Sequence, residues 1–278
     1  MNILSAPTNL GNRPYENDGT ARHTHLGPAR LRQRGIVQRL GARDLGDVPA
    51  APYRDFVRPR GGVRNEDLVV EHVRAIARAL EPAEGFTLVL GGDCSTLLGC
   101  LLGLRRATAL VFLDGHSDFG TPVTSQTGGV AGMDLALATG RGDTPLARLD
   151  PRGPLVRDEH VITAGIRDGD FADANIARAT TAQELLAHVG DRDFFIHVDA
   201  DVLDPKFMPY VDSPEPGGLD PATLTTLLAA LVAHPRAVGM ELTIYDPRDD
   251  HDARGAELLV SILENALRGT IPRSRGRR

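Results

Sequence analysis

The chain has 278 residues, of which 41% are hydrophobic and 24% charged, and its formal net charge is −6. A composition of this kind is typical of a globular domain, and the negative balance argues against a nucleic-acid binder built on a general basic field. The sequence contains no run of about 18 apolar residues, so no membrane span is predicted. The N-terminus lacks the pattern of a secretory signal. The two cysteines, Cys94 and Cys100, cannot form a disulfide framework, so we expect a reducing cytoplasm.

The first half of the chain alternates strand and helix patterns. We expect strands at Asn2–Ala6, Phe86–Leu90 and Thr108–Leu113, and helices at Leu26–Leu40, Asn65–Leu80 and Ser95–Leu104. The amphipathic pattern is strongest in the second helix, where one face carries Leu68, Val69, His72, Val73, Ile76 and Leu80. The polar stretch 11–24 predicts a loop, and the Pro- and Arg-rich stretch 41–62 has no clear period.

The second half continues the alternation. We expect strands at Val161–Ala164, Phe194–Val198 and Val238–Leu242, and helices at Ala182–Val189, Ala222–Ala233 and Ala256–Leu267. Short buried runs separated by helices predict a parallel sheet covered by helices on both faces. No repeat or linker divides the chain, so we expect one domain over residues 1–278, with the Arg-rich tail 268–278 as a solvated terminus.

Acidic residues gather where the predicted strands end. Asp93 follows the second strand, Asp114 and Asp118 follow the third, and Glu241 closes the last. Phe194–Val198 runs into Asp199, Ala200 and Asp201. Because ligands of open parallel sheets bind outside the carboxyl ends of the strands, we expect these side chains to share one crevice.

The spacing of these residues points to metal chemistry. Asp114, His116 and Asp118 are two residues apart, as are Asp199 and Asp201, and residues at i and i+2 of extended backbone face the same side. Several carboxylates in one crevice must protonate or meet a cation. One imidazole among carboxylate oxygens suits Mn²⁺ or a similar divalent ion, and there are enough carboxylates for two ions.

These motifs together resemble the ureohydrolase superfamily of arginases, agmatinases and related guanidino hydrolases. The resemblance covers nearly the whole chain and rests on three metal motifs: Gly91-Gly92-Asp93-Cys94-Ser95, Asp114-Gly115-His116-Ser117-Asp118 and Asp199-Ala200-Asp201-Val202-Leu203-Asp204-Pro205. It is supported by His25–Pro28, Thr121-Pro122 and Gly165–Asp168. The resemblance implies a three-layer α/β/α domain with a mainly parallel sheet of about eight strands, and a homo-oligomer such as a trimer or hexamer.

The resemblance also implies two Mn²⁺ ions per chain, held by six side chains. One ion would bind Cys94, Asp114, Asp118 and Asp199, and the other Asp114, His116, Asp199 and Asp201. Asp204 is expected to shape the turn with Pro205 rather than to bind metal.

The chain departs from the arginase pattern at three positions. Cys94 stands where arginases usually have histidine, and a thiolate there can weaken that manganese site or admit another metal. A cysteine-containing subset of the superfamily, which acts on N-hydroxyarginine, has this feature. Ala131 stands where arginases carry a loop histidine, and Gly120 where they carry a substrate-binding asparagine.

The expected reaction is hydrolysis of a small guanidino compound such as arginine or N-hydroxyarginine, releasing urea or a substituted urea. Two ions would hold a bridging hydroxide, and Asp118 would carry its proton to the leaving amine. Glu241 would pair with the guanidinium, while Thr127, Asp168 and Asp170 would bind the rest of the substrate.

Two alternatives remain open from the sequence. One is a zinc-dependent amidohydrolase or deacetylase on the same fold, which would hold one zinc ion per chain. The other is a non-catalytic metal-binding regulator, which the substitutions at Cys94 and Ala131 favour.

Overall fold

The computed structural model describes residues 1–59, 62–104, 107–169, 171 and 174–268. Its strands are β1 (Asn2–Ala6), β2 (Arg43–Asp47), β3 (Thr87–Gly91), β4 (Ala109–Leu113), β5 (Val161–Ala164), β6 (Ala177–Arg178), β7 (Phe194–Asp199) and β8 (Ala237–Thr243). Its α-helices are α1 (Gly27–Gln33), α2 (Ile36–Arg39), α3 (Glu66–Leu80), α4 (Thr96–Gly103), α5 (Asp134–Ala138), α6 (Ala182–Val189), α7 (Pro221–Val232) and α8 (Arg254–Leu267). Of the predicted tail 268–278, all but its first residue lie outside the described residues.

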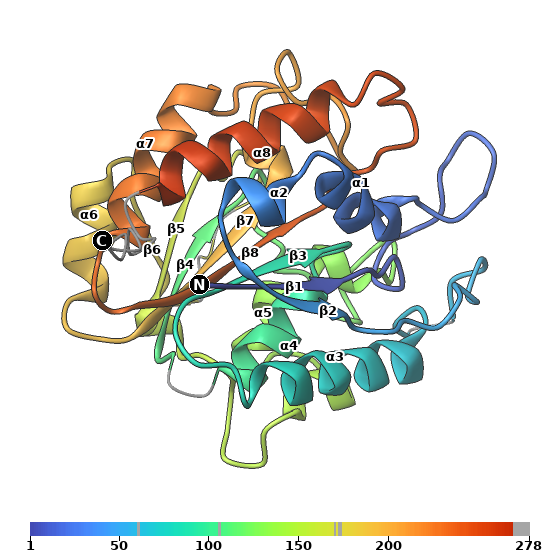
Figure 1. Ribbon diagram of the computed structural model, residues 1–278. Helices are drawn as coiled ribbons and strands as arrows, with labels where there is room; N and C mark the ends of the chain where they lie inside the picture. Colours follow the sequence, from blue (N-terminus) through green and yellow to red (C-terminus); the bar gives the residue numbers. More distant parts are fainter. Residues whose placement is uncertain (60–61, 105–106, 170, 172–173, 269–278) are drawn as a thin grey trace, which may run out of the picture.

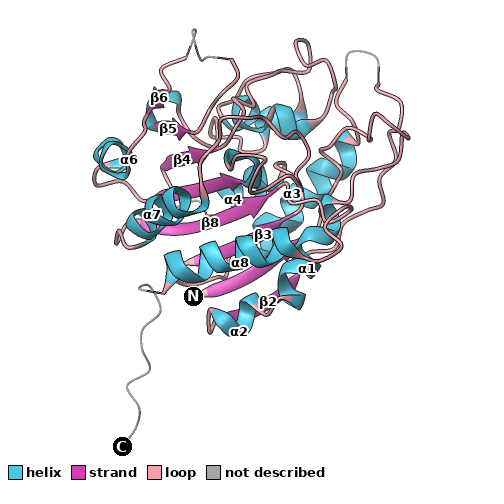
Figure 2. Cartoon of the chain, turned by 90° about the horizontal axis from the view of Figure 1, so that it is seen from above, coloured by secondary structure: helices cyan, strands magenta, loops and turns pink. Residues whose placement is uncertain are grey.

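The strands form one eight-stranded sheet in the order β2-β1-β3-β8-β7-β4-β5-β6, and every pairing between neighbours is parallel. Figure 2 shows the sheet from β6 and β5 at one edge, through β4, β8 and β3, to β2 at the other. The predicted parallel sheet of about eight strands is confirmed. Its four central strands, β3, β8, β7 and β4, are the ones that the sequence motifs follow.

Helices cover both faces of the sheet, which confirms the predicted three layers. Figure 1 shows α7, α8, α1 and α2 above the sheet and α3, α4 and α5 below it. Alternation along the strands divides the apolar core between the two faces. In β4, Val111 and Leu113 pack with the α7–α8 layer, whereas Leu110 and Phe112 pack with the α3–α4 layer.

Local signals fix where several helices begin. The side chain of Asp220 accepts a hydrogen bond from Thr223 N, and Pro221 occupies the first turn of α7. Thr181 and Glu184 form a capping box at the start of α6. Both helices therefore begin at or within one residue of the predicted position.

The helix predicted over Leu26–Leu40 is wrong in its continuity. Gly35 adopts a left-handed conformation, with φ of 78°, and separates α1 from α2. The apolar pattern persists because Leu31, Ile36 and Leu40 are all buried against the α8 layer. The apolar face of the predicted helix therefore continues across the break, and in the sequence only Gly35 marks where the helix is interrupted.

Three short elements were not predicted. β2 lies at the sheet edge and is mostly exposed, so its sequence lacks an apolar pattern. β6 has two residues at the opposite edge, and α5 has five residues, all buried. A buried helix of little more than one turn has no polar face, so it carries no helical periodicity.

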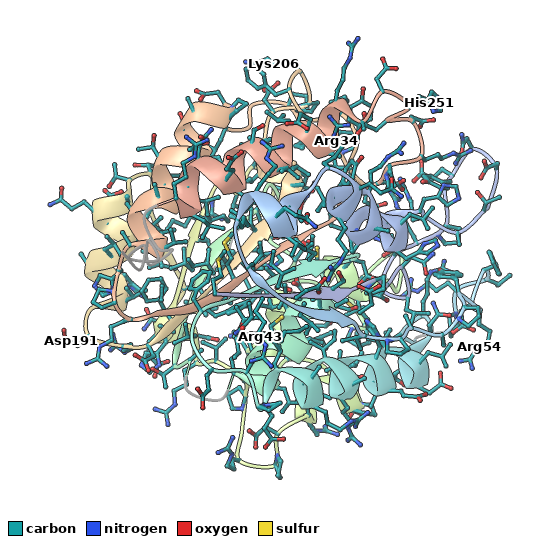
Figure 3. The ribbon with its side chains drawn as sticks, viewed as in Figure 1. Arg34, Arg43, Arg54, Asp191, Lys206 and His251 are labelled. Carbon is teal, nitrogen blue, oxygen red and sulfur yellow. The ribbon has the colours of Figure 1, made fainter. Side chains whose placement is uncertain are left out.

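Many charged side chains lie on the outside of the molecule, while a smaller set is buried. Figure 3 shows Arg54, Asp191 and Lys206 projecting from its periphery, and all three are exposed. No helix among the described residues is both long and apolar enough to span a membrane.

Candidate metal centre

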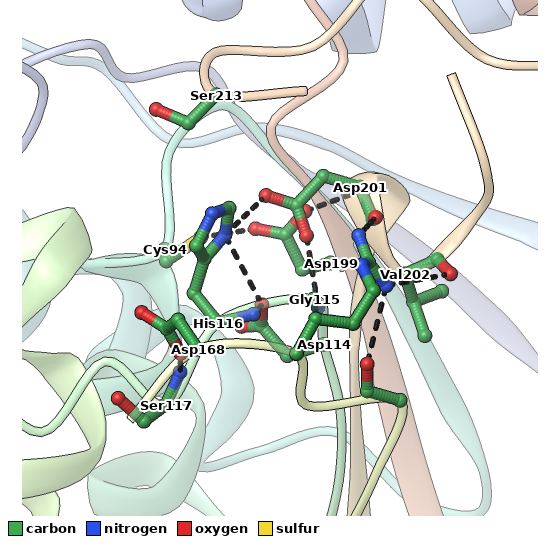
Figure 4. Close-up of polar contacts among 12 residues, drawn as sticks. Cys94, Asp114, Gly115, His116, Ser117, Asp168, Asp199, Asp201, Val202 and Ser213 are labelled. Carbon is green, nitrogen blue, oxygen red and sulfur yellow. Dashed lines mark hydrogen bonds and ion pairs between the residues drawn. The ribbon is translucent and has the colours of Figure 1, made fainter. Parts of the chain in front are cut away.

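Polar side chains meet at the carboxyl ends of the four central strands. Cys94 follows β3, Asp114 follows β4, and Asp199 is the last residue of β7. The strand register aligns these ends, since Leu113 pairs with Val198 across β4 and β7. Residues that are more than 100 positions apart in sequence therefore face one another, as Figure 4 shows.

One half of the cluster joins Asp114, His116 and Asp201. His116 Nδ1 lies 2.9 Å from Asp201 Oδ2 and 3.9 Å from Asp114 Oδ1. Backbone groups orient the carboxylates, because His116 N donates to Asp114 Oδ1 at 2.6 Å and Gly115 N donates to Asp201 Oδ1 at 3.0 Å. These three side chains present one ligand atom each within 4.8 Å of the others, which is spacing suited to a metal ion.

The other half lies around Cys94 and Asp199. Cys94 Sγ lies 3.0 Å from Asp199 Oδ2 and 3.3 Å from Thr243 Oγ1. The second oxygen of Asp199 accepts a hydrogen bond of 2.7 Å from Asp201 N, which links this half to the first. Cys94 and Asp199 form a second group of possible ligands together with His197.

Asp118 lies near both groups without belonging to either. Its side chain lines the cleft above the cluster, and its backbone is left-handed, with φ of 43°. Aspartate tolerates this conformation better than most residues, and here Asp118 lines the cleft while Asp114 is buried beneath it. The six predicted metal-ligating residues are thus gathered in one place.

The electrostatics of the cluster favour a cation. Burial raises the pKa of Asp114 to about 6, and repulsion from Asp201 adds to the effect. Burial, followed by repulsion from neighbouring carboxylates, also raises the pKa values of Asp118 and Asp199 well above their usual range. Buried like charges of this kind are stabilised when a divalent ion binds between them.

The pair of His116 and Asp201 behaves differently. Its hydrogen bond raises the pKa of His116 to about 9. Burial would raise the pKa of Asp201, but the hydrogen bond to His116 outweighs it and the pKa is lowered. In the absence of metal, His116 and Asp201 therefore share a proton, and a metal ion bound between the two side chains would replace that proton.

The donor set fits divalent metal binding. Oδ2 of Asp114 is buried and, among the described residues, meets only His197 Nε2 at a long 3.5 Å, which leaves a lone pair for a metal. Carboxylate oxygens and one imidazole suit manganese, and Cys94 adds one soft ligand. The raised pKa of the Cys94 thiol, caused by burial and then by Asp199, means that metal binding there must release a proton.

Glu241 does not lie where it could contact a substrate in the cleft, so its predicted role is wrong. Glu241 is fully buried in β8, opposite His197 of β7, and does not line the cleft. Its Oε1 lies 2.8 Å from His197 Nδ1, and its Oε2 accepts a hydrogen bond from Cys100 Sγ at 3.5 Å. Glu241 precedes the end of its strand by two residues, so its side chain lies beneath the cleft, against α4.

His197 is a site neighbour that the sequence analysis missed. Its Nε2 lies 3.5 Å from Asp114 Oδ2, and its ring stacks on Phe112 with the ring centres 4.4 Å apart. Burial lowers the pKa of His197, but the contacts with Asp114 and Glu241 outweigh burial and raise it well above its usual value. A histidine inside the apolar run Phe194–Val198 was the available signal, because a buried polar side chain needs a partner.

A cleft of about 330 Å³ opens above the cluster. Its lining comprises Gly11, Arg13, Cys94, His116, Ser117, Asp118, Phe119, Gly120, Thr127, Gly129, Ala131, Gly132, Asp168, Asp199, Asp201, Asp212, Ser213 and Ile244. Among the predicted substrate-binding residues, Thr127 and Asp168 are therefore in place, while Asp170 lies outside the described residues. Gly120 and Ala131, where the chain departs from arginases, line the same cleft.

Local hydrogen bonds hold the rim of the cleft. Asp168 Oδ1 accepts a bond of 2.6 Å from Ser117 N, which ties the loop after β5 to the metal motif. Thr127 Oγ1 accepts a bond of 3.1 Å from Gly129 N. Asp204 lies away from the cluster and accepts bonds from Lys206 N and Gly217 N, which confirms its predicted role in a turn.

Comparison with known proteins identifies the family and agrees with the fold. The model of the arginase family matches residues 14–268. An arginase of Bacillus caldovelox is 29% identical over 250 residues, covering 79% of this chain and 81% of that protein. Its solved structure superimposes with a TM-score of 0.87 at 26% identity, covering 96% of this chain and 97% of that one.

A more distant structure shows the same fold. Proclavaminate amidino hydrolase of Streptomyces clavuligerus has a TM-score of 0.71 at 21% identity, covering 95% of this chain and 89% of its own. The predicted resemblance to the ureohydrolase superfamily is confirmed, and the chain belongs to the arginase family.

Proposed function

We propose that this protein hydrolyses the C–N bond of a guanidino group, using two Mn²⁺ ions, and releases urea or a substituted urea. The observation that carries the proposal is the convergence of Cys94, His116 and four aspartates at the carboxyl ends of adjacent strands. Arginine, N-hydroxyarginine and related small guanidino compounds are the candidate substrates. The cysteine at position 94 makes the N-hydroxyarginine-specific subset of the superfamily the model for this site.

Two sets of side chains would hold the ions. Cys94, Asp114, Asp118 and Asp199 would bind one, and Asp114, His116, Asp199 and Asp201 would bind the other. When bound, such a pair lowers the pKa of water and supplies a hydroxide nucleophile near neutral pH.

The remaining work falls to side chains of the cleft. Asp118, which lines the cleft beside the ligand cluster, is placed to hold a proton and pass it to the departing nitrogen. Thr127 and Asp168 are placed to contact the polar tail of an amino-acid-like substrate. The walls of the cleft orient the guanidino carbon toward the floor, which supports catalysis by proximity.

The test is metal content and turnover on the same preparation. We expect about two manganese per chain after loading, and release of urea or hydroxyurea from one of arginine, N-hydroxyarginine, agmatine and guanidinobutyrate. Asp118→Asn should lower kcat by roughly 10²-fold or more, since proton transfer by a placed side chain contributes that much. Asp191→Asn, which changes an exposed aspartate far from the cleft, is the matched control.

The other outcomes separate the alternatives. About one zinc per chain with hydrolysis of an acetylated amine would favour the deacetylase. Full metal loading without release from any of the four compounds would overturn the proposed hydrolase and favour a regulator.

A further inference from the structure

The floor of the cleft carries an apolar side chain next to the metal cluster. Ile244 is the first residue after β8 and lines the cleft together with Cys94 and Asp199. The reacting end of a substrate therefore meets a hydrocarbon wall on this side.

The backbone at Ile244 is held in an unusual conformation. Its φ is 68°, in the left-handed region that β-branched residues rarely adopt. Two contacts fix it: Ile244 N donates to Gly92 O at 2.8 Å, and the next residue, Tyr245, forms a bridge with Val211. Strain of this kind persists where the surrounding structure determines it, and it clusters at functional sites.

The carboxylates around the described cleft are already committed. Glu241 is bonded to His197 beneath the floor. Asp212 pairs with Arg22 at 2.6 Å, and both side chains are nearly buried. Asp168 is exposed and lies on the rim, bonded to Ser117 N, where it can meet the tail of a substrate.

The remaining carboxylates of the lining are the proposed metal ligands, so their oxygens are occupied when metal is bound. Arg13 also belongs to the lining, where its guanidinium pairs with Glu16 at 2.6 Å. A guanidinium is a buried cation in such a site, and it needs a paired carboxylate to offset the loss of water. Among the described residues that line the cleft, no carboxylate is left to pair with it at the floor; Asp134, whose buried Oδ2 has no hydrogen-bond partner among them, does not line the cleft.

We propose that Ile244 selects substrates whose reacting guanidine is uncharged, namely those with an electron-withdrawing hydroxyl or acyl group on a nitrogen. Such a substituent lowers the pKa of the guanidine, so the neutral form is available to the cleft. The inference rests on the proposed function and names its substrate class. In the reaction, a C–O bond forms from water and the C–N bond to the substrate's carbon chain breaks. One proton of the water passes to the imino nitrogen of the uncharged guanidine, and the other passes to the leaving amine.

The experiment compares two matched pairs on manganese-loaded enzyme: arginine with N-hydroxyarginine, and agmatine with N-hydroxyagmatine. Each pair differs by one oxygen and shares one tail. We expect kcat/KM to favour the hydroxylated member of each pair by roughly 10- to 100-fold, the size of an unmade charged hydrogen bond. Both members of a pair are compared at the same pH. The ionisation of enzyme groups then affects both kcat/KM values equally and cancels in their ratio.

Ile244→Glu should reverse or erase this preference, because it supplies a carboxylate at the floor. Glutamate has no branched Cβ, so it tolerates the left-handed backbone better than isoleucine does. Ile244→Val is the matched control and should keep the preference. Metal content is measured on each variant, so that a change of substrate is separated from a loss of manganese.

Binding gives a second readout that does not need turnover. Calorimetry on manganese-loaded wild-type protein should show tighter binding of N-hydroxyguanidine than of guanidine, two fragments that lack the carbon chain whose C–N bond breaks in the reaction. Equal or better kcat/KM for the unsubstituted member of both pairs would overturn the inference and leave the proposed function standing. If the enzyme binds two manganese ions but releases no product from either member of either pair, both the inference and the proposed function are overturned.

Discussion

His197 and Glu241 form a buried pair that reaches the metal cluster from below. Glu241 fixes His197 through a bond of 2.8 Å, and the other ring nitrogen faces Asp114 Oδ2 at 3.5 Å. We interpret the pair as a positioning device for Asp114, because partners behind a metal ligand set its orientation and charge.

Changing this pair should weaken metal binding more than it changes the substrate preference. We expect Glu241→Gln and His197→Asn to raise the Kd for Mn²⁺ by roughly 10- to 100-fold, measured by electron paramagnetic resonance titration. Cys100→Ala is the control, since its thiol makes only the long 3.5 Å contact with Glu241. An unchanged Kd in folded Glu241→Gln protein would show that the pair has only a packing role.

Several residues of the metal cluster could be predicted from the sequence, and others could not. Asp114, His116 and Asp201 were predictable because they follow buried strands, and strand ends meet at one edge of a parallel sheet. Glu241 was misplaced because it also comes late in a strand, yet lies two residues before the end. Ile244 gave no signal, since an apolar residue after an apolar strand is indistinguishable from core.

At the scale of elements, the turn after β3 depends on one glycine. A Cβ on Gly92 would lie 1.9 Å from Thr8 O and 2.5 Å from Thr8 N, which are backbone atoms that cannot move aside. Gly92→Ala should therefore destabilise the fold by about 3 kcal/mol or more, as overpacking against backbone does. Urea denaturation measures this, with Gly132→Ala as control because a Cβ there meets nothing within 4 Å. A loss below about 1 kcal/mol would contradict the expected clash.

Helix α3 carries a pH-sensitive contact away from the metal site. His72 Nδ1 lies 3.1 Å from Pro49 O, and burial lowers the pKa of His72 despite that bond. The folded state thus binds this proton less readily than the unfolded state, whose pKa is about 6.5. The contribution of neutral His72 to stability is present above pH 6.5 and declines as the pH falls from there through the lowered folded pKa.

Thermal melts of the wild type and His72→Asn between pH 5 and 8 test this contribution. Asparagine keeps a donor near Nδ1 but does not titrate. We expect the difference in Tm, wild type minus variant, to fall as the pH drops below about 6.5. A difference that stays constant across this range would show that His72 does not titrate in folding.

Long elements with clear periodicity were predictable, and short or edge elements were not. The helix at α3 and the strands β3, β4 and β7 lie within a residue or so of their predicted bounds. β2 escaped prediction because its edge position leaves it exposed, and the break at Gly35 because its flanking apolar residues stay in phase. Both depend on tertiary context, which local patterns do not contain.

At the scale of the whole molecule, metal and stability should be coupled. Ions that bind only the folded state stabilise it by about 2.7 kcal/mol at 100 times their Kd. For a chain of this size we expect chelation to lower Tm by roughly 5 °C or more. Differential scanning fluorimetry with and without a chelator measures the shift, and restoring manganese should reverse it. In Asp199→Asn the shift should be absent; a full shift in that variant would place the stabilising metal elsewhere.

The parallel sheet also sets the order of events in time. Its metal ligands come from strands far apart in the sequence, and β7 and β8 lie between β3 and β4. The cluster therefore cannot form until the last strands have inserted into the centre of the sheet, a step that requires long-range contacts. Manganese would then bind only after the folding transition state, so it would not increase the folding rate. Its effect would be a lower unfolding rate.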